Sequence, residues 1–233
     1  MTNQFLDKYN NFIGVDETGV GDYFSPIISV ACFVLPQNID KLLELKVNDS
    51  KKLSDNYILQ IAPEIKKLVK WKKTALTQKG YNNLIKANIN NNEIKTLIHF
   101  SSINNLLKII PECLEPNVLI DQYVLNEQIF ENHFNKLNSL KWISITKPNA
   151  KIELITKAES IAIPVACASI IARSLLLETM QEQNKNYKFD FPLGASNKVI
   201  EKGKEFIKTY SIEKLNEVAK VSFKTTKKIL EEI

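Results

Sequence analysis

The chain has 233 residues, 44% apolar and 24% charged, with a net charge of +5, a composition typical of a globular protein with a substantial core. Three widely spaced cysteines with no CxxC pair and only two histidines argue against a disulfide framework and against a zinc site. The N-terminus lacks a signal-peptide pattern, and the longest apolar run, residues 161–172, is shorter than the roughly 20 residues of a membrane span, so we expect a soluble cytoplasmic protein.

Strand and helix patterns follow one another along the chain. Runs of β-branched and aromatic residues predict strands at residues 12–16, 26–35, 71–77, 117–121, 142–146 and 152–156. Helical spacing of apolar residues predicts helices at residues 54–69, 78–87, 92–108, 126–137, 159–183, 197–209 and 223–230. Strands come first, helices then alternate with strands, and helices dominate the end. This order predicts an α/β fold with a mixed sheet covered by helices.

The sequence contains no internal repeat, linker or low-complexity segment. We therefore expect residues 1–233 to form a single domain, because no composition shift marks a boundary. Its core is expected at about residues 12–184, with a helical C-terminal extension at about residues 185–233.

Lysines gather in three parts of the chain, at Lys51 and Lys52, at residues 66–73 and at residues 220–228. Such clusters are compatible with a polyanionic partner such as a nucleic acid. They are equally compatible with solvated helix and strand faces in a chain rich in lysine. The charge pattern by itself leaves both interpretations open.

Acidic residues stand where predicted strands end. Asp16 and Glu17 follow the first strand in the segment IGVDETGVGDYFSP, and Asp121 ends a later strand in NVLIDQY. Since an α/β sheet gathers its ligand sites at the carboxyl ends of its strands, these carboxylates are candidates for one site. Glu159 lies where a strand gives way to a long apolar helix, and for Glu159 alone the positive end of the helix dipole is a sufficient explanation.

The four carboxylates together predict a chemistry that none predicts alone. Two like charges about 4 Å apart repel by about 4 kcal/mol at an effective dielectric constant near 20, so an ionised cluster requires cations. Oxygen ligands favour Mg²⁺ or Mn²⁺, and two such ions about 3.5 to 4 Å apart can activate a water and stabilise the leaving oxygen of a phosphodiester. The residues therefore predict metal-dependent phosphoryl hydrolysis.

Gly19 and Gly21 directly follow the acidic pair. Their segment lacks the GK[ST] ending of a phosphate-binding loop, and two acids would repel phosphate without a metal. A tight turn before the next strand explains one glycine more easily than two. Backbone without a Cβ can instead approach a sugar edge in a minor groove, where the 2′-hydroxyl distinguishes RNA from DNA.

Six motifs in register, from about residue 12 to residue 228, closely resemble type 2 ribonucleases H. They are IGVDETGVGDYFSP, NDSKKLSD, VLIDQY, TKAES with ASIIARS, FPLGAS and AKVSFKTT. Val20 between the two glycines, together with PLGAS and FKTT, is similar to the ribonuclease HIII branch. The resemblance implies an RNase H-like fold with a central mixed five-stranded sheet flanked by helices. It also implies an endonuclease that hydrolyses the RNA strand of RNA/DNA hybrids and leaves 5′-phosphate and 3′-hydroxyl ends.

The resemblance further implies the roles of individual residues. Asp16, Glu17, Asp121 and Glu159 match the catalytic acids that bind two Mg²⁺ or Mn²⁺ ions, with Asp16 between the two. Substrate-binding positions are implied for the ribose-contacting Gly19, Val20 and Gly21, for the phosphate-contacting Asp49, Ser50, Lys51 and Lys52, and for the DNA-contacting Lys220, Lys224, Thr225 and Thr226. A helix-entry turn and a basic helix face are the simpler explanations of the second and third groups.

The chain also departs from the family pattern. Only about a dozen residues precede the first predicted strand, so we expect the usual N-terminal substrate-binding domain to be missing. Ser25 stands where the family usually has glycine, and Ser222 where histidine is common. We expect a monomer. A ribonuclease HII-like enzyme incising at embedded ribonucleotides, a catalytically impaired hybrid-binding protein and a DNA-directed nuclease of the same fold are the alternatives.

Overall fold

A mixed five-stranded sheet forms the centre of the computed structural model, which describes residues 5–47, 50–111 and 116–231. Its strands lie in the order β3-β2-β1-β4-β5. β2 is antiparallel to both its neighbours, whereas β1, β4 and β5 are parallel. Their bounds are Ile13–Thr18 (β1), Ile27–Val34 (β2), Val69–Leu76 (β3), Val118–Asp121 (β4) and Ile152–Ile155 (β5). The predicted sheet is confirmed in strand number and in its mixed character.

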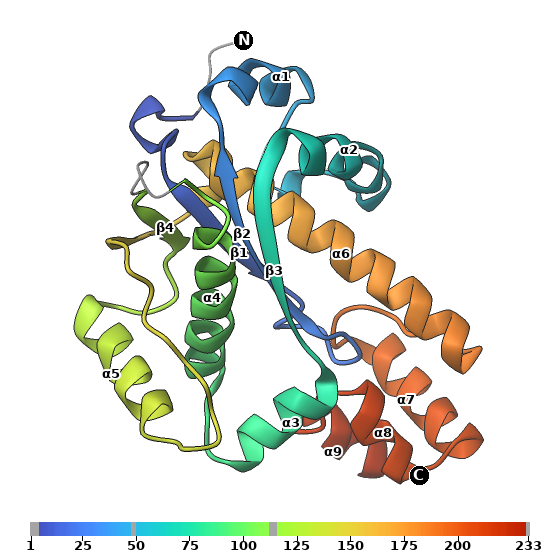
Figure 1. Ribbon diagram of the computed structural model, residues 1–233. Helices are drawn as coiled ribbons and strands as arrows, with labels where there is room; N and C mark the ends of the chain where they lie inside the picture. The colour runs from blue at the N-terminus through green and yellow to red at the C-terminus, as the bar shows by residue number, and fades with distance from the viewer. Residues whose placement is uncertain (1–4, 48–49, 112–115, 232–233) are drawn as a thin grey trace.

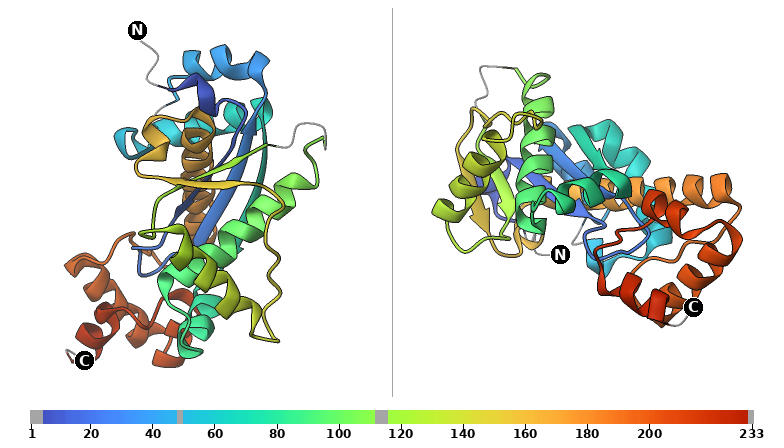
Figure 2. Two further views of the ribbon diagram at one scale, coloured as in Figure 1. Left: turned by 90° about the vertical axis from the view of Figure 1, so that its left-hand side faces the viewer. Right: turned by 90° about the horizontal axis from the view of Figure 1, so that it is seen from below.

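Helices cover both faces of this sheet (Figure 1, Figure 2). On one face, α2 (Asp55–Leu68) and α6 (Ile163–Tyr187) pack against alternate residues of β2 such as Val30 and Cys32. On the other face, α4 (Asn91–Leu107) and α5 (Glu127–Asn138) cover Ile13, Val15 and Phe33. Every residue of β2 is buried because helices press on both of its sides, which explains its continuous apolar sequence.

The contact between α6 and β1 is unusually close. Gly14 has no side chain, and a Cβ built there would lie 2.2 Å from the backbone nitrogen of Val165 and 2.3 Å from the carbonyl carbon of Pro164. Because no Cβ can occupy that space, glycine at this position lets the start of α6 rest directly on the strand. The strand end and the first turns of α6 are thereby held together.

The C-terminal region adds three helices, α7 (Asn197–Thr209), α8 (Ile212–Val218) and α9 (Lys224–Glu231), which gather beside α3 (Gln78–Lys86) (Figure 1). Side chains of α3 join them: Gln78 donates to the carbonyl oxygen of Val218, and Asn82 to that of Ala219. The helical C-terminal region is confirmed. Its role as an extension beginning near residue 185 stays a prediction.

Two of the predicted elements are wrong. Residues 142–146 form no strand, although Ile143 and Ile145 alternate with exposed neighbours. They pack on the helical layer instead, where Asn104 of α4 donates to the carbonyl oxygen of Thr146. The long apolar helix begins at Ile163 rather than at Glu159, because Pro164 in its first turn favours a helix start there.

Two short helices were not predicted, α8 and α1 (Ile39–Glu44). The other predicted helices agree with the structure to within a few residues, apart from the longest. That helix, α6, is the one described helix with the length and hydropathy of a membrane span, and 78% of the relevant window is buried inside the protein. Its apolar sequence is accounted for by its place in the core.

Candidate active site

The ends of β1 and β4 bring Asp16 and Asp121 to the same edge of the sheet. The two strands are parallel, with Val15 opposite Ile120, so the next residue in each strand is an aspartate. β5 continues the parallel set with Ile155 opposite Asp121, and the chain then turns into the 3₁₀ helix η5 (Ala158–Ser160), which carries Glu159. This register explains why the acids at the ends of neighbouring parallel strands lie at one edge of the sheet, as expected.

Neighbouring residues on a strand point to opposite faces, and this alternation separates Asp16 from Glu17. Asp16 turns to the α6 face, where Ser169 lies near its carboxylate and favours its ionised form. Glu17 turns to the α4 face, where it meets Lys95 and His99. The two adjacent acids therefore reach the site from two different layers of the protein.

Lys95 and His99 hold both carboxylate oxygens of Glu17. Lys95 Nζ lies 2.7 Å from Oε1 and His99 Nε2 lies 2.9 Å from Oε2. The two residues are four apart on α4, so they share one face of the helix. Sequence analysis missed both as site residues, although their spacing in a predicted helix was visible.

Glu159 is almost wholly buried, and one of its carboxylate oxygens has no protein partner. Oε1 lies 3.4 Å from Nζ of Lys51, whose side chain is 77% exposed. Oε2 is buried without a hydrogen bond. Because a buried, unpaired carboxylate oxygen costs free energy, its presence here indicates a site that a further ligand completes. A helix-dipole explanation is weakened, since Glu159 precedes the first turn of α6.

The charges of the cluster shift its protonation equilibria in opposite directions. Burial, with the nearby charge of Glu17, raises the pKa of Asp16 to about 8. Burial also raises the pKa of Asp121, and the charge of Glu159 adds to the shift. Burial disfavours ionised Glu17, but the hydrogen bond from His99 and the charge of Lys95 outweigh it and lower the pKa of Glu17 to about 2. The protein alone does not favour a fully ionised cluster.

These donors fit a hard divalent cation. All four candidate ligands are carboxylates, and the cluster combines a raised pKa at Asp16 with an orphaned oxygen at Glu159. Within the described ranges, no three His, Cys, Asp or Glu side chains are already arranged around one point. Glu17 is engaged by Lys95 and His99, and Glu159 by Lys51, so binding an ion requires these carboxylates to exchange those side chains for the ion.

We expect Mn²⁺ affinity to rise with pH up to about 8. Below that pH, Asp16 holds a proton that must leave before its carboxylate can bind a cation, which weakens binding about tenfold for each pH unit. Glu17, with a pKa of about 2, releases no proton in this range. Calorimetric titration at pH 6 and pH 7.5 measures the difference, with Asp16→Asn as the control that removes the dependence. Equal affinities at the two pH values would contradict the assignment.

The glycine loop adjoins the acids in a cleft of about 590 Å³, whose lining includes Asp16, Asp121, Gly19, Val20 and Lys51. Gly19 has φ +86°, and a Cβ there would lie 2.1 Å from the carbonyl oxygen of Pro26, so the turn itself requires glycine. Val20 packs against apolar side chains beneath the loop. Gly21 is exposed, and nothing lies within 4 Å of the place that a Cβ would take, so the fold leaves the space in front of it open.

The predicted phosphate-contacting group is placed only in part. Asp49 lies outside the described residues. Ser50 borders the cleft and shares a 2.6 Å hydrogen bond with Ser169, which lies near Asp16. Lys51 leans over the cleft towards Glu159, and Lys52 is exposed. Ser50 and Lys51 are therefore beside the acids, as a substrate-binding role requires.

The predicted DNA-contacting group divides into exposed and buried members. Lys224 is exposed at the start of α9, whereas Thr225 is buried and Thr226 shares a 2.8 Å hydrogen bond with Tyr23. Lys220 is completely buried, and its ammonium donates to backbone carbonyl groups. A side chain with no exposed surface cannot meet a DNA phosphate, so the prediction of direct contact is wrong for Lys220.

Arg173 borders the same cleft without belonging to the acidic cluster. Its guanidinium makes two hydrogen bonds to Asp55 at the start of α2, at 2.8 and 2.9 Å. The paired geometry joins α6 to α2 beside the site. We infer that both residues stabilise the wall of the cleft.

Comparisons with known proteins agree on one family. The family described as Ribonuclease HII matches residues 13–226. Ribonuclease HIII of Lactococcus lactis is 34% identical over 223 residues, which are 96% of this chain and 73% of that protein. Ribonuclease HIII of Oceanobacillus iheyensis is 36% identical over 220 residues, which are 94% of this chain and 69% of that protein.

Solved structures show the same similarity. The crystal structure of Bst-RNase HIII in complex with Mn²⁺ superposes with a TM-score of 0.86 at 33% identity, covering 94% of this chain and 69% of that one. Ribonuclease H2 from Pyrococcus horikoshii OT3 gives a TM-score of 0.74 at 21% identity, covering 95% and 97% of the two chains. At that identity the second likeness concerns the fold alone.

Proposed function

Because the chain belongs to the ribonuclease HII family, in its ribonuclease HIII branch, it is a metal-dependent ribonuclease H, and we propose that it cuts RNA/DNA hybrids with two divalent ions. The RNA strand is the one hydrolysed, leaving 5′-phosphate and 3′-hydroxyl ends. The ions are Mg²⁺ or Mn²⁺. The observation that carries this proposal is the meeting of Asp16, Asp121 and the glycine loop in one cleft.

The four acids would hold the ions in this proposal. Asp16 and Asp121 would contribute from the ends of neighbouring parallel strands, Glu159 from η5, and Glu17 from the α4 side. Bound ions would supply a nucleophilic water and stabilise charge on the leaving oxygen. The backbone N–H of Ala158 orients Asp121 through a hydrogen bond of 3.1 Å.

Lys95 and His99 take a supporting role in the proposed reaction. They stabilise the ionised form of Glu17 and hold its carboxylate at the α4 side of the cleft. Lys95 is itself constrained, since its ammonium also lies 5.1 Å from the ring centre of Tyr123. Keeping Glu17 ionised while its neighbour Asp16 tends to be protonated reduces the repulsion between the two adjacent carboxylates in the protein without an ion.

The hybrid would reach the acids across the glycine loop. Exposed Gly21 offers bare backbone to a ribose, whereas Gly19 and Val20 shape the turn behind it. Ser50 and Lys51 line the same cleft and Lys52 is exposed beside them, so all three are proposed as donors to phosphates. Lys224 is exposed on α9 and is proposed to meet the DNA strand. Thr226 supports the loop through Tyr23.

We also infer that the enzyme works as a monomer in the cytoplasm. Three of the four acids and part of the glycine loop, Gly19 and Val20, line one cleft within a single chain. Cys32 and Cys167 are buried free thiols, and burial together with the nearby Cys167 raises the pKa of Cys32. Unbridged neighbouring thiols fit a reducing compartment.

Cleavage of three end-labelled duplexes tests the proposal. They are a full RNA/DNA hybrid, a DNA duplex carrying four consecutive ribonucleotides, and a DNA duplex carrying one, each with Mg²⁺ and with Mn²⁺. We expect cutting of the first two with either ion, no cutting after chelation with EDTA, and products with 5′-phosphate ends. Preferential incision at the single ribonucleotide would instead support the ribonuclease HII-like alternative. An all-DNA duplex is added as a control, and its cleavage at the same rate as the hybrid would support a DNA-directed nuclease. Binding without any cleavage would support an impaired hybrid-binding protein.

A further inference from the structure

Lys220 is a fully buried lysine whose charged end lies under the glycine loop. Its ammonium donates to the carbonyl oxygen of Gly19 at 2.9 Å and to the carbonyl oxygen of Ser25 in a shorter contact. Ser25 Oγ lies 3.4 Å away as a third acceptor. No part of the residue is exposed, so all of its polar contacts are made inside the protein.

Burying an ammonium is costly unless its charge and donors are matched. Two aromatic rings add to the carbonyl groups here, with the centres of Tyr81 and Phe223 at 5.8 and 5.7 Å from Nζ. Burial lowers the pKa of Lys220, and the carboxylate of Asp22 opposes the shift. A neutral apolar side chain would fill this place at lower cost, so the lysine indicates a requirement other than packing.

The groups that Lys220 contacts are the two ends of the loop at residues 19–25. Gly19 O also accepts from the backbone N–H of Asp22 and from Ser25 Oγ, both at 3.3 Å, so the turn closes around the ammonium. The backbone N–H of Lys220 donates to Tyr23 O at 2.9 Å. One residue of the C-terminal region thus holds the beginning, middle and end of this loop.

Further contacts from the C-terminal region follow the same loop. Gly194 donates its N–H to Asp22 at 2.6 Å and accepts from the N–H of Tyr23 at 2.9 Å. Thr226 bonds the hydroxyl group of Tyr23. Gly21 is the part of the loop that these contacts leave exposed. The C-terminal region therefore determines how the bare backbone at Gly21 is presented to solvent, next to Val20 in the wall of the cleft.

We propose that Lys220 is a positioning residue, which fixes the backbone of residues 19–25 and so sets the surface that meets the hybrid without touching it. The inference rests on the proposed function for its link to hybrid binding. Its structural part, the ordering of the loop by the ammonium, is independent of any activity.

Lys220→Met tests both parts, because methionine nearly preserves the shape and removes the charge and all donors. Two carbonyl groups lose charged hydrogen bonds, so we expect backbone amides within residues 19–25 to exchange hydrogen about tenfold faster. KM for a full hybrid rises about tenfold while kcat changes less than about threefold, since the acids keep their places. Hydrogen exchange followed by mass spectrometry and steady-state cleavage give these two readouts.

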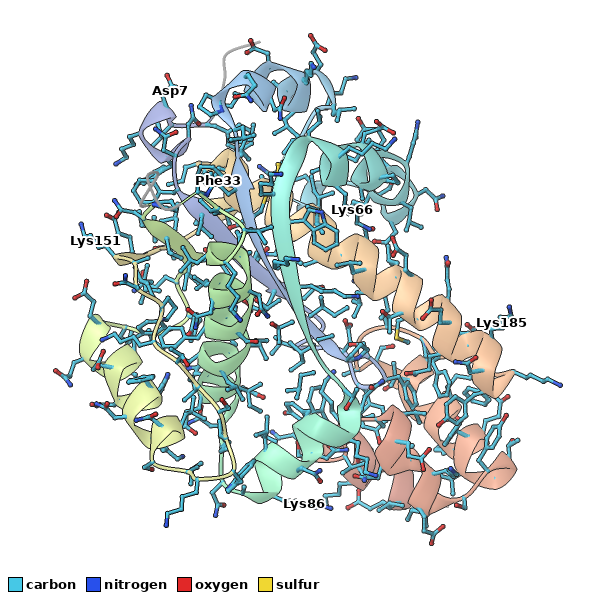
Figure 3. The ribbon with its side chains drawn as sticks, in the orientation of Figure 1. Asp7, Phe33, Lys66, Lys86, Lys151 and Lys185 are labelled. Atoms are coloured by element: carbon cyan, nitrogen blue, oxygen red, sulfur yellow. The ribbon has the colours of Figure 1, made fainter. Side chains whose placement is uncertain are left out.

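Lys66→Met is the matched control. Lys66 is a largely buried lysine at the contact between α2 and α6, where it donates to Ser174 and Glu178 (Figure 3). Its loss lowers stability without changing either loop exchange or KM. Where Lys220→Met does not fold, Lys220→Gln supplies the measurement, with a smaller rise in loop exchange because glutamine retains donors on a shorter side chain.

Unchanged exchange within residues 19–25 in a folded Lys220 variant would overturn the proposal, and so would faster loop exchange with an unchanged KM. A parent protein that neither binds nor cuts the hybrid would contradict the proposed function instead. In that case the exchange comparison with Lys66→Met still decides whether Lys220 orders the loop.

Discussion

Asp121→Asn lowers the metal-dependent cleavage of an RNA/DNA hybrid by at least about 10³-fold, because an amide cannot replace a carboxylate as an anionic ligand and several kcal/mol of transition-state stabilisation are lost. Hybrid affinity stays within about threefold of the parent, since the glycine loop and the lysine donors remain. The substitution preserves side-chain volume, and the N–H of Ala158 can still donate to the retained oxygen. Single-turnover cleavage with Mg²⁺, together with fluorescence anisotropy in EDTA, measures the two quantities.

Asp55→Asn provides the control for this experiment. Asp55 borders the same cleft, but its carboxylate is paired with Arg173 and it is not one of the four proposed metal ligands. We expect its removal to alter the cleavage rate by less than about tenfold and stability by about 1 kcal/mol or less, as for other exposed ion pairs. An Asp121→Asn protein that cuts as fast as the parent would refute the assignment of the active site.

Gly14→Ala destabilises the protein by about 3 kcal/mol or more, because the added methyl group would stand 2.2 Å from the backbone of Val165. The three atoms nearest to the added methyl group belong to the backbone of Pro164 and Val165, so no flexible side chain can move aside. Relief requires α6 to shift away from β1, and this shift also carries Ser169 away from Asp16. Urea unfolding measures the loss of stability, and cleavage by the folded fraction should fall with it.

Gly21→Ala is the contrasting substitution in the same segment. Nothing lies within 4 Å of its added methyl group, and its φ is not in the left-handed region, so stability changes by less than about 1 kcal/mol. Hybrid affinity nevertheless falls, because the methyl group stands where the backbone is proposed to approach the ribose. Wild-type stability in Gly14→Ala, or wild-type hybrid affinity in Gly21→Ala, would show that the corresponding glycine has another purpose.

Local patterns in the amino-acid sequence determined much of the sheet and part of the acidic cluster. Period-2 and continuous apolar runs predicted the five strands that form, since strand propensity and burial act on neighbouring residues. Asp16 and Asp121 could be paired from the amino-acid sequence alone, because both end strands and parallel strands end at one edge. For Glu159 alone a helix start was a sufficient explanation, so it joined them only as a member of the set of four carboxylates, and the family motif then supported it.

Only the tertiary structure decided the roles that depend on residues far apart in the chain. The alternating apolar residues at 142–146 could form a strand only beside a partner strand. In the structure they pack against the helical layer instead. The partners of Glu17, Lys95 and His99, lie on a helix 78 and 82 residues later in the chain.

Lys220 shows the limit most clearly. In the sequence it is one lysine of a basic cluster, like exposed Lys224. Burial separates the two, because the loop at residues 19–25 folds its carbonyl groups around one ammonium and leaves the other in solvent. A sequence determines which side chains can carry charge and which strands can form, since these properties are local. Solvent exposure and long-range contacts depend on how the whole chain packs. They decide whether a charged side chain contacts the substrate itself or instead positions backbone that contacts the substrate.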